Sequence, residues 1–127
     1  INGLVRWTIA RGLSALEAWA GTPGTVGGAI YGNAHWRQAN IGEVVESVRV
    51  MTRDGGVRQV PADRLDFDYD TSRLQQSGEI LIWAAFRVRP GHDPDALRAV
   101  ARASLAFRKQ TQPLSNPNQH PRSRKRP

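Results

Sequence analysis

Hydrophobic positions in the first dozen residues recur with the period of a helix. A helix drawn over residues 2–11 places four such positions on one side: Leu4, Val5, Thr8 and Ile9. Gly12 follows where a helix commonly ends, because glycine adopts the left-handed conformation of a helix terminus without strain. We therefore predict an amphipathic helix that ends near Gly12.

A second helical pattern begins at residue 93. Asp93 is suited to cap a helix, Pro94 is suited to its first position, and the pattern continues to about Lys109. The predicted buried side consists of Leu97, Val100, Ala101, Ser104 and Leu105.

Strand-like sequence fills most of the region between these helices. Residues 44–60 predict two strands joined by a tight turn at Asp54, Gly55 and Gly56, which is a hairpin signal. One helical turn at 61–65 and a polar loop at 66–78 follow. Residues 79–89 then predict a buried strand that ends before Pro90 and Gly91. We expect an α+β fold with an antiparallel sheet and flanking helices.

Composition limits the function classes. The 127 residues fit one domain, and the absence of cysteine excludes disulfides, thiol catalysis and thiolate metal ligation. No secretion signal or membrane span is evident, so we expect a cytoplasmic location and no membrane partner. The formal charge is +7, but the final segment "PRSRKRP" carries four positive charges and leaves +3 for the rest. The basic character therefore belongs mainly to the tail.

The segment "GTPGTVGG", residues 21–28, is the main candidate for binding chemistry. It leads into a predicted short helix over 26–32 and has few side chains, so the backbone can approach a ligand closely. Such a loop suits a phosphate or pyrophosphate. It lacks the lysine of a P-loop and the spacing of a dinucleotide-binding fingerprint. From these residues alone, a glycine-rich connection and a ligand-binding loop are equally good interpretations.

Four sequence motifs follow one another in the same order as in a known protein family. "GLSALEAWAGTPGTVGGAIYGNA", "IGEVVESVRVMTRDGGVRQV", "DFDYDTSRLQQSGEILIWAAFRVRPG" and "LAFRKQTQPLSNPN" closely resemble successive segments of the UDP-N-acetylenolpyruvoylglucosamine reductase family, also called UDP-N-acetylmuramate dehydrogenases. The resemblance covers roughly residues 3–118. The "PGTVGG" loop alone is shared with other oxidases of the same flavoprotein superfamily.

The resemblance implies both a fold and a reaction. It implies the second subdomain of a vanillyl-alcohol-oxidase-like (PCMH-type) FAD-binding domain. In this family NADPH reduces FAD, and the flavin passes hydride to the enolpyruvyl group of UDP-N-acetylglucosamine enolpyruvate. The product, UDP-N-acetylmuramate, is a precursor of the bacterial cell wall that determines cell shape and permits cell division.

The same resemblance carries roles to individual positions. The residues expected to contact FAD are Gly21, Thr22, Pro23, Gly24, Thr25, Val26, Gly27, Gly28, Asn33 and, through its backbone, Ile80. Tyr69 and Ser72 match the family's "Y-R-x-S" and are expected to face the substrate and nicotinamide. The alternative is that they only fix a loop.

Three departures from the family pattern concern the chemistry. Asp70 stands where the family has an arginine, and an acid there would repel a substrate carboxylate. Arg73 is the first candidate to replace that cation. His35 follows Asn33 and Ala34 in place of the family's glycine, and we expect it to line the site rather than bind a metal or act as a base. After Asn118 the family's segment with the proton-donating serine is replaced by "QHPRSRKRP".

These departures give the expected domain organisation. Residues 1–110 would be part of an FAD-binding domain, and residues 111–127 a basic, disordered tail where the substrate domain would begin. We expect a monomer that is inactive alone and takes no metal. Two alternatives remain open: another FAD-linked oxidoreductase of the superfamily, and a small basic nucleic-acid-binding module, favoured only by the tail.

Overall fold

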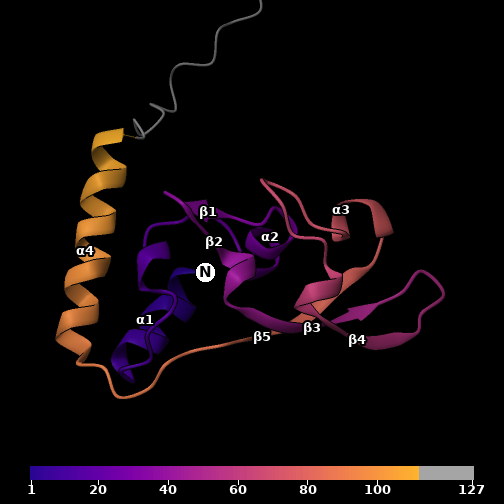
Figure 1. The fold of residues 1–127 in the computed structure, drawn as a ribbon, viewed down its shortest axis with the longest axis horizontal. Helices are drawn as coiled ribbons and strands as arrows, with labels where there is room; N and C mark the ends of the chain where they lie inside the picture. Colours follow the sequence, from indigo (N-terminus) through magenta and orange to yellow (C-terminus); the bar gives the residue numbers. More distant parts are fainter. Residues whose placement is uncertain (112–127) are drawn as a thin grey trace, which may run out of the picture.

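A three-stranded antiparallel sheet forms one end of the molecule. The computed structural model describes residues 1–111, and Figure 1 shows the sheet at the end opposite the longest helix. Its strands are β3 (Val45–Met51), β4 (Val57–Pro61) and β5 (Ile80–Phe86), in the order β4-β3-β5. The turn between β3 and β4 contains Gly55 at φ +87°, which confirms the predicted hairpin.

Short elements connect the hairpin to β5. The 3-10 turn η3 (Ala62–Arg64) confirms the predicted helical turn after the hairpin. The segment predicted as a polar loop contains one further helical turn, α3 (Leu74–Ser77). This turn forms because Leu74 is buried against the sheet residues, so a segment that is polar in sequence still has an anchor in the core.

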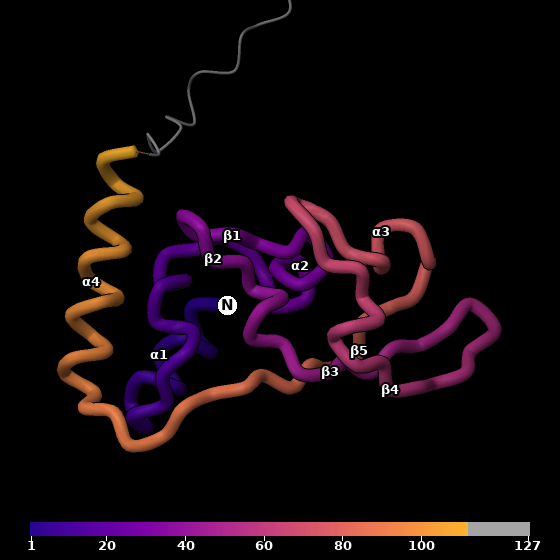
Figure 2. Tube along the Cα trace, in the orientation of Figure 1, coloured from indigo at the N-terminus to yellow at the C-terminus, as the bar shows by residue number. Residues whose placement is uncertain are grey.

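The other end of the molecule is helical. Helix α1 (Asn2–Ala10) and the 3-10 turn η1 (Glu17–Trp19) pack against the long helix α4 (Pro94–Thr111). Between them and the sheet lie α2 (Val26–Tyr31), a two-residue hairpin of β1 (His35–Trp36) and β2 (Ala39–Asn40), and the turn η2 (Ile41–Glu43). In Figure 2 the tube crosses from sheet to α4 along one side of the molecule after β5.

Two apolar cores correspond to these two ends. The first joins α1, η1 and α4 through residues such as Leu16, Trp19 and Leu97. The second joins α2 to the sheet, with Ile30 and Val48 fully buried. Phe86, the last residue of β5, packs against both cores. The two ends therefore share few core residues.

Two burial predictions were wrong. Strand β5 is not a buried strand: Ile80 is 65% exposed and Ile82 is 47% exposed, because β5 is an edge strand with one face uncovered by the described residues. On α4, Val100 and Leu105 are also exposed, and Arg108 is buried instead. The reason is that α4 packs mainly against α1 and η1, and near its C-terminal end against Trp36 of β1, so it buries a narrow stripe.

The α+β class and the antiparallel sheet with flanking helices are as predicted. Helix α1 confirms the first helical pattern, and Gly12 follows it at φ +66°. Within residues 1–111, no helix is long and apolar enough to cross a membrane. Apart from Thr111, the last residue of α4, the predicted disordered tail lies outside the described residues.

Candidate functional site

The glycine-rich loop has a backbone that few other residues could adopt. Gly21 has φ +83° and Gly24 has φ +94°, both in the left-handed region that favours glycine. Thr25 then caps α2, and its Oγ1 accepts a hydrogen bond from the Gly28 amide at 3.0 Å. The predicted loop and short helix are therefore both present.

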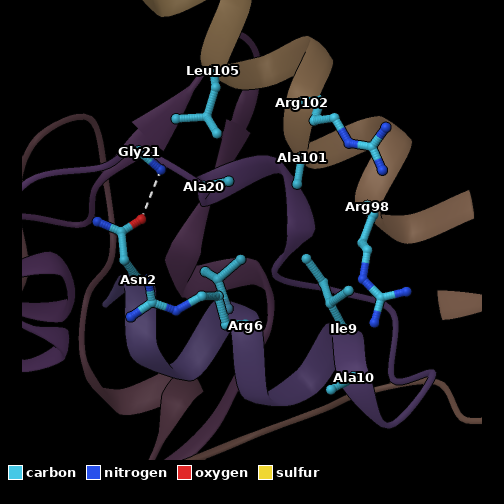
Figure 3. A pocket seen from close by; sticks show the side chains of 11 residues that line it. Asn2, Arg6, Ile9, Ala10, Ala20, Gly21, Arg98, Ala101, Arg102 and Leu105 are labelled. Carbon is cyan, nitrogen blue, oxygen red and sulfur yellow. Dashed lines mark hydrogen bonds between the residues drawn. The ribbon is translucent and has the colours of Figure 1, made fainter. Parts of the chain in front are cut away.

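Two side chains from distant elements hold this loop in place. From α1, the Asn2 Oδ1 accepts a 2.7 Å hydrogen bond from the Gly21 amide, shown as a dashed line in Figure 3. From α4, the Arg108 Nη2 donates to the Thr22 Oγ1 at 2.9 Å, and its guanidinium lies 3.9 Å from the centre of the Trp36 ring. Burial lowers the pKa of Arg108. Sequence reasoning missed both supports, since neither has a local signal.

A cavity of about 350 Å³ lies beside the C-terminal half of the loop. Its lining residues are Thr25, Gly27, Gly28, Tyr31, Leu74, Glu79 and Leu81. A Cβ placed on Gly27 would have no heavy atom nearer than 3.8 Å, so the missing side chain leaves real space there. Ile80 does not line this cavity, but its neighbours on both sides do. The cavity thus lies between the glycine loop and the start of β5. Both segments contain residues that were assigned to the FAD site from the sequence.

Glu79 brings a buried negative charge to the rim of this cavity. Its Oε1 lies 2.9 Å from the Arg73 Nη2, and its Oε2 lies 3.2 Å from the Arg58 Nη2. Burial alone would raise the pKa of Glu79, but hydrogen bonds from Ser77 and Arg58 and the charges of both arginines outweigh it and lower the pKa. Glu79 therefore stays ionised, and Arg73 is engaged with it.

Asn33 connects two loops below the surface. It is 2% exposed and has φ +46°. Its Nδ2 donates to the Asp68 carbonyl oxygen at 2.7 Å, and its Oδ1 accepts from the Gly42 amide at 2.9 Å. Asn33 and Tyr69 both line a second cavity of about 360 Å³. Asn33 thus fixes the backbone of the "Y-x-x-S" loop relative to α2.

The loop from Tyr69 to Arg73 has one exposed end and one buried end. Tyr69 is 73% exposed, as a residue that contacts a ligand must be before the ligand arrives. Ser72 is 1% exposed, and its Oγ donates a 2.8 Å hydrogen bond to the Tyr31 carbonyl oxygen. In this arrangement Ser72 ties the loop to the end of α2, which is the alternative role that the sequence left open for it.

The two unusual positions near the site lie in contact with each other. The Asp70 Oδ1 is 3.0 Å from the His35 Nδ1, and the Tyr69 ring is 5.3 Å from the His35 ring. Asp70 has φ +51°, and its carbonyl oxygen accepts a hydrogen bond from the Gln75 Nε2. The sequence singled out both residues but gave no sign that they meet, because 35 positions separate them.

A larger groove lies between α1 and α4 (Figure 3). It has a volume of about 690 Å³, and its floor is apolar, with Arg6, Arg98 and Arg102 among its lining residues. Gly21 is the only predicted site residue in its lining. The groove is therefore separate from the cavities at the glycine loop and at Tyr69. No group of three potential metal-ligating side chains occurs within residues 1–111.

Comparison with known proteins agrees with the motifs. Residues 1–60 match a family model described as an FAD binding domain. A UDP-N-acetylenolpyruvoylglucosamine reductase of Synechococcus sp. (strain CC9605) is 42% identical over 119 residues, which cover 93% of this chain and 40% of that protein. A protein of the same name from Gloeobacter violaceus is 38% identical over 118 residues, again 40% of its length.

A solved structure matches the fold as well. The crystal structure of the UDP-N-acetylenolpyruvylglucosamine reductase from Thermus caldophilus superimposes with a TM-score of 0.75 at 28% identity, over 84% of this chain and 39% of that one. These matches confirm the resemblance in the four motifs and the FAD-binding-domain fold. The chain is similar to one part of the UDP-N-acetylenolpyruvoylglucosamine reductases, and it spans about two fifths of the length of the relatives it matches.

Proposed function

We propose that this chain forms one wall of the flavin site of a UDP-N-acetylenolpyruvoylglucosamine reductase, and that the glycine loop binds FAD mainly through its backbone. The observation that carries the proposal is the cavity beside Gly27 and Gly28, because the loop side of its lining, Thr25 to Tyr31, belongs to residues 1–60, which match the FAD-binding family model. The space at the Gly27 Cβ position allows a flat ligand to approach the backbone. The residues present therefore fit the cofactor.

FAD would supply the redox chemistry, taking hydride from NADPH and passing it to the enolpyruvyl group of UDP-N-acetylglucosamine enolpyruvate. This chain's contribution is to bind and orient. Asn2 and Arg108 hold the loop, and Thr25 fixes the start of α2. Tyr69 is exposed beside the second cavity and would contact the substrate or nicotinamide. Ser72 and Arg73 would act through the position of this loop.

Further parts of the proposal concern organisation. Residues 1–110 would belong to the FAD-binding domain, and residues 111–127 would be a basic tail outside it. The protein would be a monomer. It would be located in the cytoplasm, where UDP-sugars and NADPH are available for cell-wall synthesis. Another FAD-linked oxidoreductase of the same superfamily is the second candidate, and the observation favouring it is Asp70 in place of the family's arginine.

The test supplies the segments that the chain does not span. The chain is fused in register to the flanking segments of the Synechococcus relative, and the visible absorbance of bound FAD is measured. We expect the fusion to retain FAD and the 127-residue chain alone to retain little. Gly27→Ala should weaken FAD binding at least tenfold, about 1.4 kcal/mol, because its methyl group enters the cavity.

Gly3→Ala is the matched control, since nothing lies within 4 Å of a Cβ at that position. It should leave FAD binding unchanged. In the fusion, NADPH oxidation should depend on UDP-N-acetylglucosamine enolpyruvate. A folded fusion without FAD would refute the role of the loop, and FAD binding without this activity would favour the second candidate.

A further inference from the structure

The position of the family's arginine creates a charge problem that Asp70 cannot solve. A substrate carboxylate needs a cation or a hydrogen-bond donor beside it, because removing a charge from water without a partner is costly. Asp70 is negatively charged, like the substrate carboxylate, and would repel it. The cation must therefore come from a neighbour of Asp70.

Arg73, the nearest candidate in sequence, is already occupied. Its guanidinium lies 2.9 Å from the Oε1 and 3.1 Å from the Oε2 of Glu79, whose side chain is only 6% exposed. It also donates to the Arg64 carbonyl oxygen. Turning Arg73 toward Asp70 would leave the buried carboxylate of Glu79 with Arg58 as its one cationic partner among the described residues, and Arg58 is 56% exposed. Arg73 is therefore a poor replacement.

His35 meets the requirements that Arg73 does not. Its Nδ1 lies 3.0 Å from the Asp70 Oδ1, so an Nδ1–H would donate to the carboxylate and leave Nε2 facing away from it. Among the described residues, no other hydrogen bond to the His35 ring is formed. The His35 side chain is 40% exposed, and the neighbouring Tyr69 ring limits its rotation. With both ring nitrogens protonated, a histidine is a cation whose Nε2–H can donate to a second carboxylate while its Nδ1–H donates to the first.

We propose that His35, positioned by Asp70, binds the carboxylate of the substrate in place of the missing arginine. The two departures from the family pattern then form one unit, in which Asp70 acts on the substrate only through His35. The Asp70 backbone is fixed for this task by Gln75, whose Nε2 donates to the carbonyl oxygens of both Asp70 and Tyr31. The inference rests on the proposed function for the identity of the carboxylate.

The test uses the 127-residue chain and NMR of its histidine and tyrosine rings. The probe is UDP-N-acetylglucosamine enolpyruvate, and UDP-N-acetylglucosamine, which lacks the carboxylate, is the control ligand. We expect a saturable shift of the His35 ring signals with the probe and none with the control ligand. His35→Gln should weaken binding of the probe roughly tenfold, the low end for a charge-assisted hydrogen bond at an exposed site.

Three further variants separate the roles of charge and position. His35→Arg should keep most of the affinity, because a guanidinium also binds carboxylates. Asp70→Asn keeps a residue that tolerates φ +51° and still accepts a hydrogen bond, so it should weaken binding only severalfold and shift the His35 signals without ligand. His92→Gln, at another exposed histidine that makes no hydrogen bond to Asp70, should change nothing.

The outcomes distinguish this inference from the proposed function. Binding of the probe that shifts Tyr69 but not His35, or equal affinity in His35→Gln, would overturn the inference and leave the proposed function standing. Equal shifts with both ligands would also overturn it, because the carboxylate would then play no part. Absence of any binding of the probe to the chain would overturn the inference, whereas the proposed function is tested separately by FAD retention in the fusion.

Discussion

The hydroxyl group of Ser72 donates a 2.8 Å hydrogen bond to the carbonyl oxygen of Tyr31, although 41 positions separate the two residues. Tyr31 is the last residue of α2, whose first residues belong to the glycine loop. A six-residue helix is about 9 Å long. The bond therefore sets the distance between the proposed flavin wall and the loop that carries Tyr69.

Ser72→Ala should lower the free energy of unfolding by about 1 kcal/mol, the typical net value of a hydrogen bond. The loss stays moderate because the Tyr31 carbonyl oxygen also accepts from the Gln75 Nε2 at 3.0 Å. Urea denaturation measures the change. Gln76→Ala, at an exposed position of the same segment, serves as the control. Equal stability of the two variants would show that the Ser72 bond contributes nothing.

Gly42→Ala should destabilise the protein by about 1–3 kcal/mol. A Cβ at residue 42 would lie 2.6 Å from the Phe67 ring and 2.8 Å from the Asn33 Oδ1, so the side chain that joins the two loops would be displaced. Gly3→Ala, in a helix with open space around it, should instead stabilise by about 0.5–1 kcal/mol. The midpoints of urea denaturation give both values, and a tolerated Gly42→Ala would mean that Phe67 moves aside freely.

Glu79→Gln should cost roughly 1.5–3 kcal/mol at neutral pH, because it removes the charged acceptor of two arginines. The folded-state pKa of Glu79 is depressed below its ordinary value of 4.5. Its contribution is therefore complete above that value and is lost as the pH falls through the folded-state pKa.

Urea denaturation of both proteins across pH 7 to about 3 tests this expectation. The difference in the free energy of unfolding between the unchanged protein and Glu79→Gln should be constant from pH 7 to about 5 and should become smaller below pH 4.5. A gap of constant size down to pH 3 would show that the ionised carboxylate is not what stabilises this corner.

Arg108→Met should loosen the glycine loop while keeping most of the apolar contact with Trp36. The guanidinium donates to Thr22, and the Gly21 and Thr22 amides are both hydrogen-bonded in the closed loop. We expect hydrogen exchange of these two amides to become about tenfold faster. Arg102→Ala, at an exposed residue of the same helix that makes no hydrogen bond to the loop, is the control. Exchange that speeds up equally in both variants would refute a specific role for Arg108.

Local chemistry accounts for the parts of the fold that the sequence predicted. Asp54, Gly55 and Gly56 make a turn wherever they occur between two strands, and Thr25 caps a helix by its own side chain. The glycine loop was predicted in the same way, since a backbone with positive φ favours glycine and the glycines can be read directly from the sequence. Each of these features depends on residues within a few positions of one another.

Burial and long-range pairing were harder to predict because they depend on what covers a surface. The run from Ile80 to Phe86 is apolar enough for a buried strand, yet its place at the sheet edge exposes Ile80. Arg108 is charged in sequence but buried, since the end of α4 packs against Trp36 of β1 and beside Thr22 of the glycine loop. The contact of His35 with Asp70 likewise needs the whole chain between them to be folded.

Phe86 is shared by two apolar cores that otherwise have separate members, and the glycine loop begins in one core and ends in the other. Ala20 belongs to the helical core, whereas Val26 packs against the core of the sheet. Regions with separate cores can open independently. A loop that is anchored in both cores keeps its shape only while both cores remain folded and packed together. The affinity of this loop for a ligand therefore also reports how stably the two ends of the molecule are packed against each other.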